Sequence, residues 1–322
     1  MGECLIVRRG GESYELPVLS ASYPKDVTVT AAAGASASFS ISITTPGRPA
    51  EYTYQWYRNG AAVSGGTAAS LTLTGLTAAA TYSVYCKVTN KAGSVNSRTA
   101  TLTVRSYLPT YTYTGTHQLI DEGNFNWRLK LFTSGTLTFS YLGNAGTQGA
   151  QVFLVGGGGG AGGFGAGGGG GYTRTGTVAL ATGTGYPIIV GAGGAAGGNA
   201  GGDSSALGLT VSGGRGGGYN FAAGGDGGSG GGGRPYGPGG TDGGNGGTGT
   251  VGDARGPGGS GQGSTTREFG LPTGTLYSSG GWGMDAAHTQ DEAANTGNGG
   301  DSNGDNGKAG GSGIVIIRNH RG

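Results

Sequence analysis

The stretch QVFLVGGGGG, residues 151–160, decides what fold this chain can have. A second apolar run, IVIIR at 314–318, follows Gly313 near the other end of the chain. Most of the 81 glycines lie between these two runs. Short apolar runs rich in β-branched residues favour buried β-strands. Because a disordered linker would have no register against flanking strands, we predict a folded module whose interior is built from glycine.

The overall composition sets limits on the fold and on the partners. A chain of 322 residues is long enough for two domains, but only 34% of it is hydrophobic. We therefore expect one ordinary hydrophobic core in the first half and another source of order in the second. Charged residues make up 11% and the net charge is +2. This balance predicts neither nucleic-acid binding nor attachment to a membrane surface.

The two cysteines, Cys4 and Cys86, lie far apart without a CxxC motif or a neighbouring histidine, so a zinc site is not expected. The apolar run at the N-terminus is too short for a signal peptide. No stretch has the length and hydrophobicity to cross a membrane. The chain is therefore expected to be made in a cytoplasm, and its unusual second half suggests assembly into a virus particle.

Alternating polar and apolar residues, interrupted by turn signals, predict an all-β protein. The clearest alternation lies in the first half, with the spacing that is typical of a β-sandwich. A β-hairpin is expected around the turn at 122–124, between strands at 118–120 and 126–131. The predicted organisation is a leader at 1–23, a sandwich at 24–105, a linker at 106–112 and a glycine-rich β domain at 113–322.

The first domain resembles an immunoglobulin-like domain of the kind found on bacterial and phage surfaces. The resemblance rests on Trp56 in YQWY, on the leucines of SLTL at 70–73, and on CKVTN at 86–90. Phe39 or Ile41 replaces the second cysteine of that family, and Val84 stands where its corner tyrosine would be. The resemblance therefore implies a core held by Trp56 and aliphatic packing, with no disulfide to Cys86.

Four structures are considered for the glycine tract. Collagen is excluded because no Gly-X-Y period persists and only 10 residues are proline. A flexible linker is the usual interpretation of such a composition. Nucleotide-binding loops match only by chance, since the nearest Walker-like site around Lys308 lacks its defining residues. The fourth structure is a bundle of polyglycine II helices.

A polyglycine II helix has three residues per turn and no internal hydrogen bonds. Every backbone N–H and C=O must therefore bond to a neighbouring helix. Glycine is required because the helices approach one another backbone to backbone, where a Cβ would clash. We predict an inserted lattice of such helices, held in register by the flanking strands.

The strand borders of the tract carry a second resemblance, at SGTLTF (134–139), VFLVGGGG (152–159), IVGAGG (189–194) and GSGIVIIR (311–318). These segments resemble the glycine-rich domain of phage tail-fibre and bacterial surface proteins. The resemblance covers roughly residues 113–318. It implies a role as a fibre or adhesin of a phage particle.

Large side chains interrupt the tract at a few places, and aromatic residues in a Gly/Ser/Asn background are typical of adaptable contact surfaces. We predict that these residues bind a receptor, although they could instead pack on the β strands. The candidate receptor-binding residues are Tyr219, Phe221, Tyr236, Phe269, Tyr277, Trp282 and Met284.

Catalytic and metal sites are not expected. Residues 301–307 place oxygen donors at alternate positions, but the glycine falls one place late and no glutamate closes a calcium loop. His288 with Asp291 and Glu292 lacks the partners of a nucleophilic site. We therefore predict no enzymatic activity, no cofactor and no bound metal.

These features together predict a structural and adhesive protein on the surface of a phage particle, either a tail fibre or a receptor-binding tip. Residues 1–23 are expected to attach it to other virion proteins, and the glycine-rich domain to contact a host receptor or glycan. The alternatives are a head fibre or capsid decoration protein and a bacterial cell-surface protein. A homo-oligomer is compatible with each of them.

Overall fold

The computed structural model describes residues 6–9, 12–146, 149–163, 165–219, 223–233, 266–283, 290–302 and 306–319, with the backbone alone at 6–9 and 12. Its regular elements are β-strands and two short 3-10 helices, and the described residues include no α-helix. The prediction of an all-β protein is confirmed. The chain divides into two compact units, Met1–Tyr107 and Leu108–Gly322. Their boundary lies in the predicted linker, although strand β13 already begins at Thr110.

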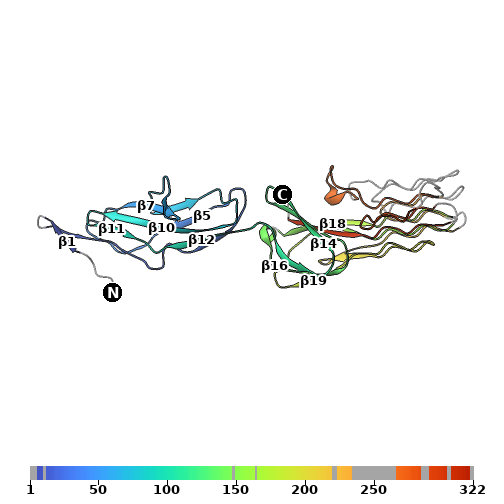
Figure 1. Ribbon diagram of the computed structural model, residues 1–322, viewed down its shortest axis with the longest axis horizontal. Coiled ribbons are helices and arrows are strands. Elements are labelled where there is room, and N and C mark those ends of the chain that lie inside the picture. The colour runs from blue at the N-terminus through green and yellow to red at the C-terminus, as the bar shows by residue number, and fades with distance from the viewer. Residues whose placement is uncertain are drawn as a thin grey trace. The chain divides into compact units, whose positions relative to one another are not determined.

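The first unit is built around one sheet with strand order β4-β12-β10-β7-β8, and β11 pairs with β10 (Figure 1). Its strands are β1 (Ile6–Arg9), β2 (Glu12–Glu15), β3 (Val18–Leu19), β4 (Val27–Thr30), β5 (Ala37–Ser40), β6 (Ile43–Thr45), β7 (Thr53–Arg58), β8 (Ala61–Ala62), β9 (Ser70–Leu73), β10 (Ala80–Asn90), β11 (Gly93–Asn96) and β12 (Ala100–Arg105). Three two-stranded sheets, β1-β2, β3-β6 and β5-β9, complete the unit. Because β3 pairs with β6, the predicted leader is partly built into this unit.

The core of the first unit lies around Trp56, whose side chain is completely buried. Trp56 sits opposite Cys86 in the β7–β10 register, and its indole Nε1 donates a hydrogen bond to the Ala68 carbonyl at 2.9 Å. The ring of Phe39, from β5, lies 6.4 Å from the Trp56 ring. The small β5-β9 sheet therefore packs on the large sheet through this aromatic pair.

Cys86 is a free and buried thiol, as the sequence predicted, and burial raises its pKa to about 11. Cys4, the other cysteine, lies outside the described residues.

The second unit contains two five-stranded sheets, β13-β16-β19-β20-β21 and β14-β15-β22-β17-β18. Its elements are β13 (Thr110–Tyr113), β14 (His117–Gly123), β15 (Asn126–Leu131), β16 (Gly135–Tyr141), η1 (Gly143–Gly146), β17 (Ala150–Val155), β18 (Thr173–Val178), β19 (Gly185–Ile189), β20 (Ser204–Ala206), β21 (Leu209–Val211), η2 (Glu268–Gly270) and β22 (Ile314–Asn319). The predicted hairpin is present as β14–β15. The last strand, β22, lies between β15 and β17.

The strands on either side of the glycine tract, β17 and β22, are therefore antiparallel neighbours in the middle of one sheet. All six residues of β22 are buried, and so are the last four of β17. Val152 and Leu154 share one face of the sheet. Strand β20 of the other sheet lies against β17 and β22. Phe153 and Val155 share the opposite face, which residues 266–278 cover. Burial on both faces explains why these strands read as continuous apolar runs.

Candidate interaction surface

The glycine tract that leaves β17, residues 156–162, forms neither a helix of the α type nor a strand, and it donates its backbone hydrogen bonds to other segments. The N–H of Gly157 reaches the Gly202 carbonyl at 2.9 Å, and three residues later the N–H of Gly160 reaches the Asn199 carbonyl at 2.8 Å. The full set of donors and acceptor segments is Gly157 and Gly160 to 199–202, Gly158 and Ala161 to 308–311, and Gly156, Gly159 and Gly162 to 166–172. The same neighbour therefore returns every third residue.

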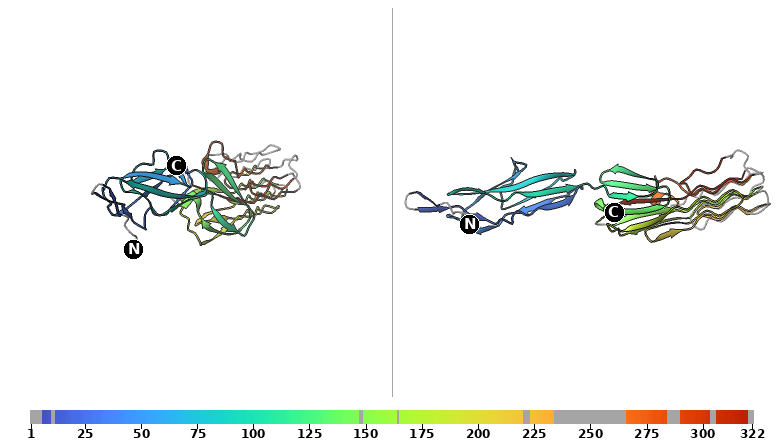
Figure 2. Two further views of the ribbon diagram at one scale, coloured as in Figure 1. Left: turned by 60° about the vertical axis from the view of Figure 1, so that its left-hand side comes forward. Right: turned by 60° about the horizontal axis from the view of Figure 1, so that its bottom comes forward.

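The carbonyl groups of this tract are used in the same periodic way. Gly157 accepts from Gly214, and Gly160 accepts from Gly217, at 2.8 and 2.9 Å. Two further segments donate as well, from Gly194 and Gly197 and from Gly300. The tract thus donates to three segments and accepts from three others, and its residues are all buried. Figures 1 and 2 show these segments running side by side away from the two sheets.

Glycine is required in this packing because the backbones are in contact. A Cβ added to Gly157 would lie 2.0 Å from the Ala192 carbonyl oxygen, and one added to Gly158 would lie 1.9 Å from that of Asn298. A Cβ on Gly159 would meet the Arg215 oxygen at 2.1 Å. These separations are far inside van der Waals contact, and the clashing atom is backbone each time. Each of these positions therefore excludes every residue larger than glycine.

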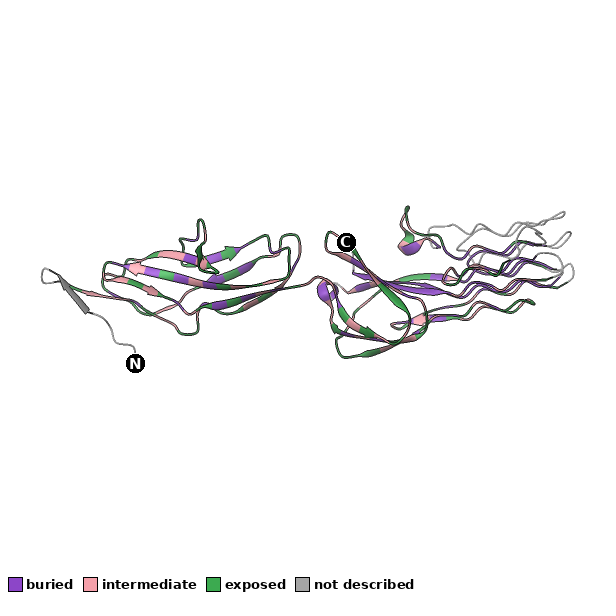
Figure 3. Ribbon diagram, viewed as in Figure 1, coloured by how far each residue is buried: buried purple, intermediate pink, exposed green. Residues whose placement is uncertain are grey.

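The outer tracts carry side chains at every third residue, on the side that faces solvent. In the tract that follows β19, Gly191 and Gly194 are buried whereas Ala192 and Ala195 are exposed. The tract that follows β21 repeats this spacing, with Ser212 and Arg215 exposed. Figure 3 shows the resulting contrast between buried inner tracts and partly exposed outer ones. The three-residue period therefore governs side-chain placement as well as hydrogen bonding.

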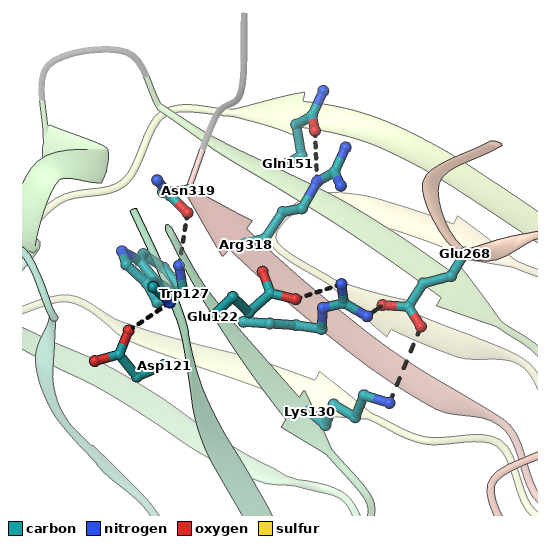
Figure 4. Close-up of polar contacts among 10 residues, drawn as sticks. Asp121, Glu122, Trp127, Lys130, Gln151, Glu268, Arg318 and Asn319 are labelled. Carbon is teal, nitrogen blue, oxygen red and sulfur yellow. Dashed lines mark hydrogen bonds and ion pairs between the residues drawn. The ribbon is translucent and has the colours of Figure 1, made fainter. Parts of the chain in front are cut away.

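A charged cluster lies at the end of the tracts next to the sheets (Figure 4). Glu268, from η2, is only 1% exposed and forms an ion pair with Arg128 of β15. Arg128 also pairs with Glu122, its Nη2 lying 2.5 Å from Oε1, and Lys130 Nζ lies 4.0 Å from Glu268 Oε2. The cluster therefore attaches the 266–278 segment to the sheet. A buried carboxylate of this kind depends on its cationic partners.

Arg318 of β22 completes the same region. Its Nε donates a hydrogen bond to Gln151 Oε1 at 2.7 Å, and its guanidinium lies 4.0 Å from the centre of the Phe269 ring. The Phe269 ring in turn lies 5.7 Å from that of Phe153. Phe269 thus packs against strands β17 and β22 of the sheet.

The opposite end of the tracts, away from the sheets, presents two exposed aromatic side chains. Tyr219, which is 56% exposed, ends the neighbouring tract beside Gly163. Trp282 is 37% exposed, and its backbone N–H donates to Asp301 Oδ1 at 2.6 Å. We call the region of Gly163, Tyr219, Trp282 and Ser302 the outer end.

Residues 133–320 match the family model of a glycine-rich domain. The match covers more than half of the chain. The chain belongs to this glycine-rich domain family. The match begins shortly before β16 and ends just after β22, so it includes the tracts and both strands that enclose them. No curated protein matches the chain.

The structure distributes the candidate receptor-binding residues of the glycine-rich domain over two places. Tyr219 and Trp282 lie at the outer end, exposed to solvent. Tyr277 is only 5% exposed, and its ring lies 5.6 Å from that of Phe153 in the core below η2. Phe269 is half-buried against the same core, so both aromatic residues take part in the packing that the sequence allowed as the alternative. The remaining candidates, Phe221, Tyr236 and Met284, lie outside the described residues.

The described residues contain no group of three or more His, Cys, Asp or Glu side chains that could hold a metal ion. Asp301 is buried and its carboxylate accepts the Trp282 N–H, while residues 303–305 of the considered calcium loop lie outside the described residues. The carboxylate of Asp291 accepts the Ala309 N–H at 2.9 Å, and His288 also lies outside. Within the described part, no helix is long and apolar enough to cross a membrane.

The cluster of Arg128 and Glu268 was not predicted from the sequence. The segment around Glu268 stands out in the sequence for its aromatic residues, not for its charge. A usable signal was present in β15, where Arg128 and Lys130 alternate with Leu129 and Leu131. Alternating basic residues place two positive charges on one face of a strand. That face required an acidic partner from elsewhere in the chain.

Proposed function

We propose that this chain is a structural and adhesive protein on the surface of a phage particle, with the outer end of its glycine-rich domain contacting the host cell. In this proposal the first unit is an immunoglobulin-like β-sandwich and the tracts are polyglycine II helices. Residues 1–23 attach the protein to other virion proteins. The observation that carries the adhesive role is the pair of exposed aromatic residues, Tyr219 and Trp282, on a closely hydrogen-bonded support.

The polyglycine II assignment is supported by the period of the hydrogen bonds. A helix with three residues per turn and no internal hydrogen bonds sends every third N–H in the same direction. Gly157 and Gly160 donate to one neighbouring segment. The same period is found in a second pair of segments, where the N–H groups of Gly167 and Gly170 reach the carbonyls of Gly232 and Ser229 at 3.0 and 2.9 Å. Strands would instead place their side chains and bonds with a period of two.

The immunoglobulin-like assignment is supported by the side chains that the resemblance named. Trp56 is fully buried beside Cys86, and Leu71 and Leu73 are buried in β9, which pairs with β5. Val84, in the corner position, is buried as well. These contacts agree with a core that needs no disulfide.

The proposed adhesive role is supported by how the outer end is built. Exposed aromatic side chains lose little conformational entropy on binding, since each has only two rotatable side-chain bonds. The tracts beneath them are fixed by backbone hydrogen bonds at each turn. A site on such a support requires little ordering when it binds, and this preserves affinity.

The test uses the full chain, fluorescently labelled, and flow cytometry against a panel of bacterial cells. Tyr219→Ala and Trp282→Ala are expected to weaken cell binding by at least about 30-fold, which corresponds to about 2 kcal/mol for a buried aromatic anchor. The melting temperature should stay near that of the wild type. Ile189→Ala is the matched control, because Ile189 is 51% exposed but lies in β19, next to the sheets.

Failure to bind any cell type, or equal binding by Tyr219→Ala, Trp282→Ala and wild type, would reject the adhesive role. Immunogold labelling of purified phage particles with an antibody against residues 24–105 separates the remaining alternatives. Label on tail fibres supports the proposal, label on the capsid favours a head fibre, and label on bacterial cells alone favours a bacterial surface protein.

A further inference from the structure

The first unit contains an open cavity at one end of its core. Its volume is about 540 Å³, within the range of roughly 300–1,000 Å³ that small-molecule sites occupy. Residues of β7, β8, β9 and β10 and of the β7–β8 turn line it. Arg58 lies two residues beyond Trp56 in β7, so its side chain is on the core face of the sheet. The cavity therefore lies where the apolar core between the large sheet and the β5-β9 sheet ends.

This cavity carries one unpaired cation. Arg58 is the single charged side chain among the described residues that line it. Its guanidinium lies over the Tyr82 ring, 5.2 Å from the ring centre, and forms no ion pair with a carboxylate in the described part of the chain. Stacking on an aromatic ring holds the planar guanidinium in place while its N–H groups stay available. The described protein therefore leaves this positive charge unbalanced.

A second hydrogen-bond donor is fixed beside Arg58. Asn59 has a φ of 50° in the turn between β7 and β8, and its N–H donates to the Ser83 carbonyl at 2.9 Å. Its Oδ1 accepts the Ser83 N–H, also at 2.9 Å. Because Oδ1 is the acceptor in this pair, the Asn59 Nδ2 group is left as a donor, with no acceptor among the described residues. Two positioned donors thus line one cavity.

The rest of the lining suits a ligand with hydroxyl groups. The side chains of Ser64 and Thr74 are exposed, and each can both donate and accept a hydrogen bond. Leu73 supplies an apolar wall. A guanidinium binds a carboxylate through two parallel hydrogen bonds. Together these groups favour a small molecule that carries one carboxylate and several hydroxyl groups.

We infer that this cavity binds a sugar acid, whose carboxylate is held by Arg58 and the Asn59 Nδ2 group. The hydroxyl groups of the sugar lie against Ser64 and Thr74. Because an exposed ion pair contributes little in water, the binding is weak, in the millimolar range. The inference goes beyond the proposed function, since it concerns the first unit and not the outer end.

The test titrates sodium D-glucuronate into the isotopically labelled full chain and follows the amide signals by NMR. The signals of residues 58–64 and 72–74 should shift to saturation at millimolar concentration. D-Glucose lacks the carboxylate and sodium acetate lacks the hydroxyl groups. Each should bind at least about tenfold more weakly than glucuronate, the size of loss expected when hydrogen bonds to a site are removed.

Three variants identify the groups that bind. Arg58→Gln should weaken glucuronate binding at least about tenfold, since it removes the bidentate partner of the carboxylate. The matched control is Lys87→Gln, which removes one positive charge from the exposed opposite face of the same sheet and should bind like the wild type. Asn59→Asp keeps an oxygen that accepts the Ser83 N–H but places a carboxylate beside Arg58. It should abolish binding while the melting temperature is kept.

The inference is overturned if glucuronate causes no saturable shift at these residues, or if Arg58→Gln binds as tightly as the wild type. It is also overturned if Lys87→Gln loses as much affinity as Arg58→Gln, because the effect is then one of net charge. Acetate or inorganic phosphate binding as tightly as glucuronate would show a general anion site and overturn the assignment to sugar acids. Cell binding through Tyr219 and Trp282 is a separate readout that none of these outcomes alters.

Discussion

The first unit and the glycine tracts of the second unit achieve order in opposite ways. The first unit surrounds a large side chain, Trp56, with other buried side chains. Residues 156–162 contain almost no side chains and are held by backbone hydrogen bonds to the segments around them. The first kind of order is damaged when atoms are removed, and the second when atoms are added. This difference can be tested directly by substitution.

The largest effect is expected from removing the central side chain of the first unit. Trp56→Ala should lower the free energy of unfolding of that unit by about 4 kcal/mol, through lost burial and the cavity left behind. Urea unfolding should show the first unit melting earlier while the transition of the second unit stays in place. Lys87→Ala, at an exposed position of β10, is the control. A loss below about 1 kcal/mol would mean that Trp56 does not organise the core.

The charged cluster below the tracts should respond almost as strongly. Arg128→Met leaves Glu268 buried without its closest cation and should cost about 3 kcal/mol in the second unit. Adding Glu268→Gln to this variant removes the unpaired charge, so the double variant should recover most of the loss. Urea unfolding of both variants measures the difference. If the double variant is no more stable than Arg128→Met, the ion pair is not what attaches the 266–278 segment.

Adding a single methyl group inside the tracts should come next. Gly160→Ala places a Cβ 2.0 Å from the Ala195 oxygen, and overpacking against backbone should cost about 2 kcal/mol. The control is Gly185→Ala in β19, where the nearest atom to the new Cβ is Thr136 Cγ2 at 3.4 Å. Thermal unfolding should separate the two variants. Equal tolerance at both sites would contradict the close backbone packing of the tracts.

A smaller effect should appear only at alkaline pH. Burial, and then the charge of Glu268, raise the pKa of Tyr277 above its usual value of 10.0. Stability that depends on the neutral phenol is fully present below about pH 10 and is lost as the pH rises through the higher folded-state pKa. The wild type should therefore unfold at a lower urea concentration at about pH 11 than at about pH 8. In Tyr277→Phe this difference between the two urea midpoints should be smaller. Identical pH dependence in the two proteins would exclude Tyr277 as the source.

The smallest perturbation tests the first unit without changing its stability. Because burial raises the pKa of the Cys86 thiol to about 11, this thiol should react very slowly with a disulfide reagent in the folded protein. Unfolding without a reductant should release two reactive thiols, Cys4 and Cys86. Finding none would reveal a disulfide between them and would contradict the free, buried thiol.

Several features could be predicted from the sequence because they depend on local patterns. The alternation in residues 126–131 predicts the strand β15, and the turn residues before it predict the hairpin with β14. The continuous apolar runs at 152–155 and 314–317 predict strands buried on both faces. The positions of the candidate contact residues were harder to predict from the sequence. Tyr219 and Tyr277 are both tyrosines in glycine-rich surroundings, and nothing local separates the exposed one from the buried one.

The sequence by itself determined that the protein is all-β and that its glycines lie between two strands. It also determined that Cys86 lacks a cysteine partner in the neighbouring strands. Local periodicity and composition are sufficient for these conclusions. Only the tertiary structure decided that β22 lies between β15 and β17, that Glu268 meets Arg128, and which residues of each tract face inward. These contacts join segments far apart in the chain. A glycine tract also has no side-chain pattern from which its neighbouring segments could be predicted.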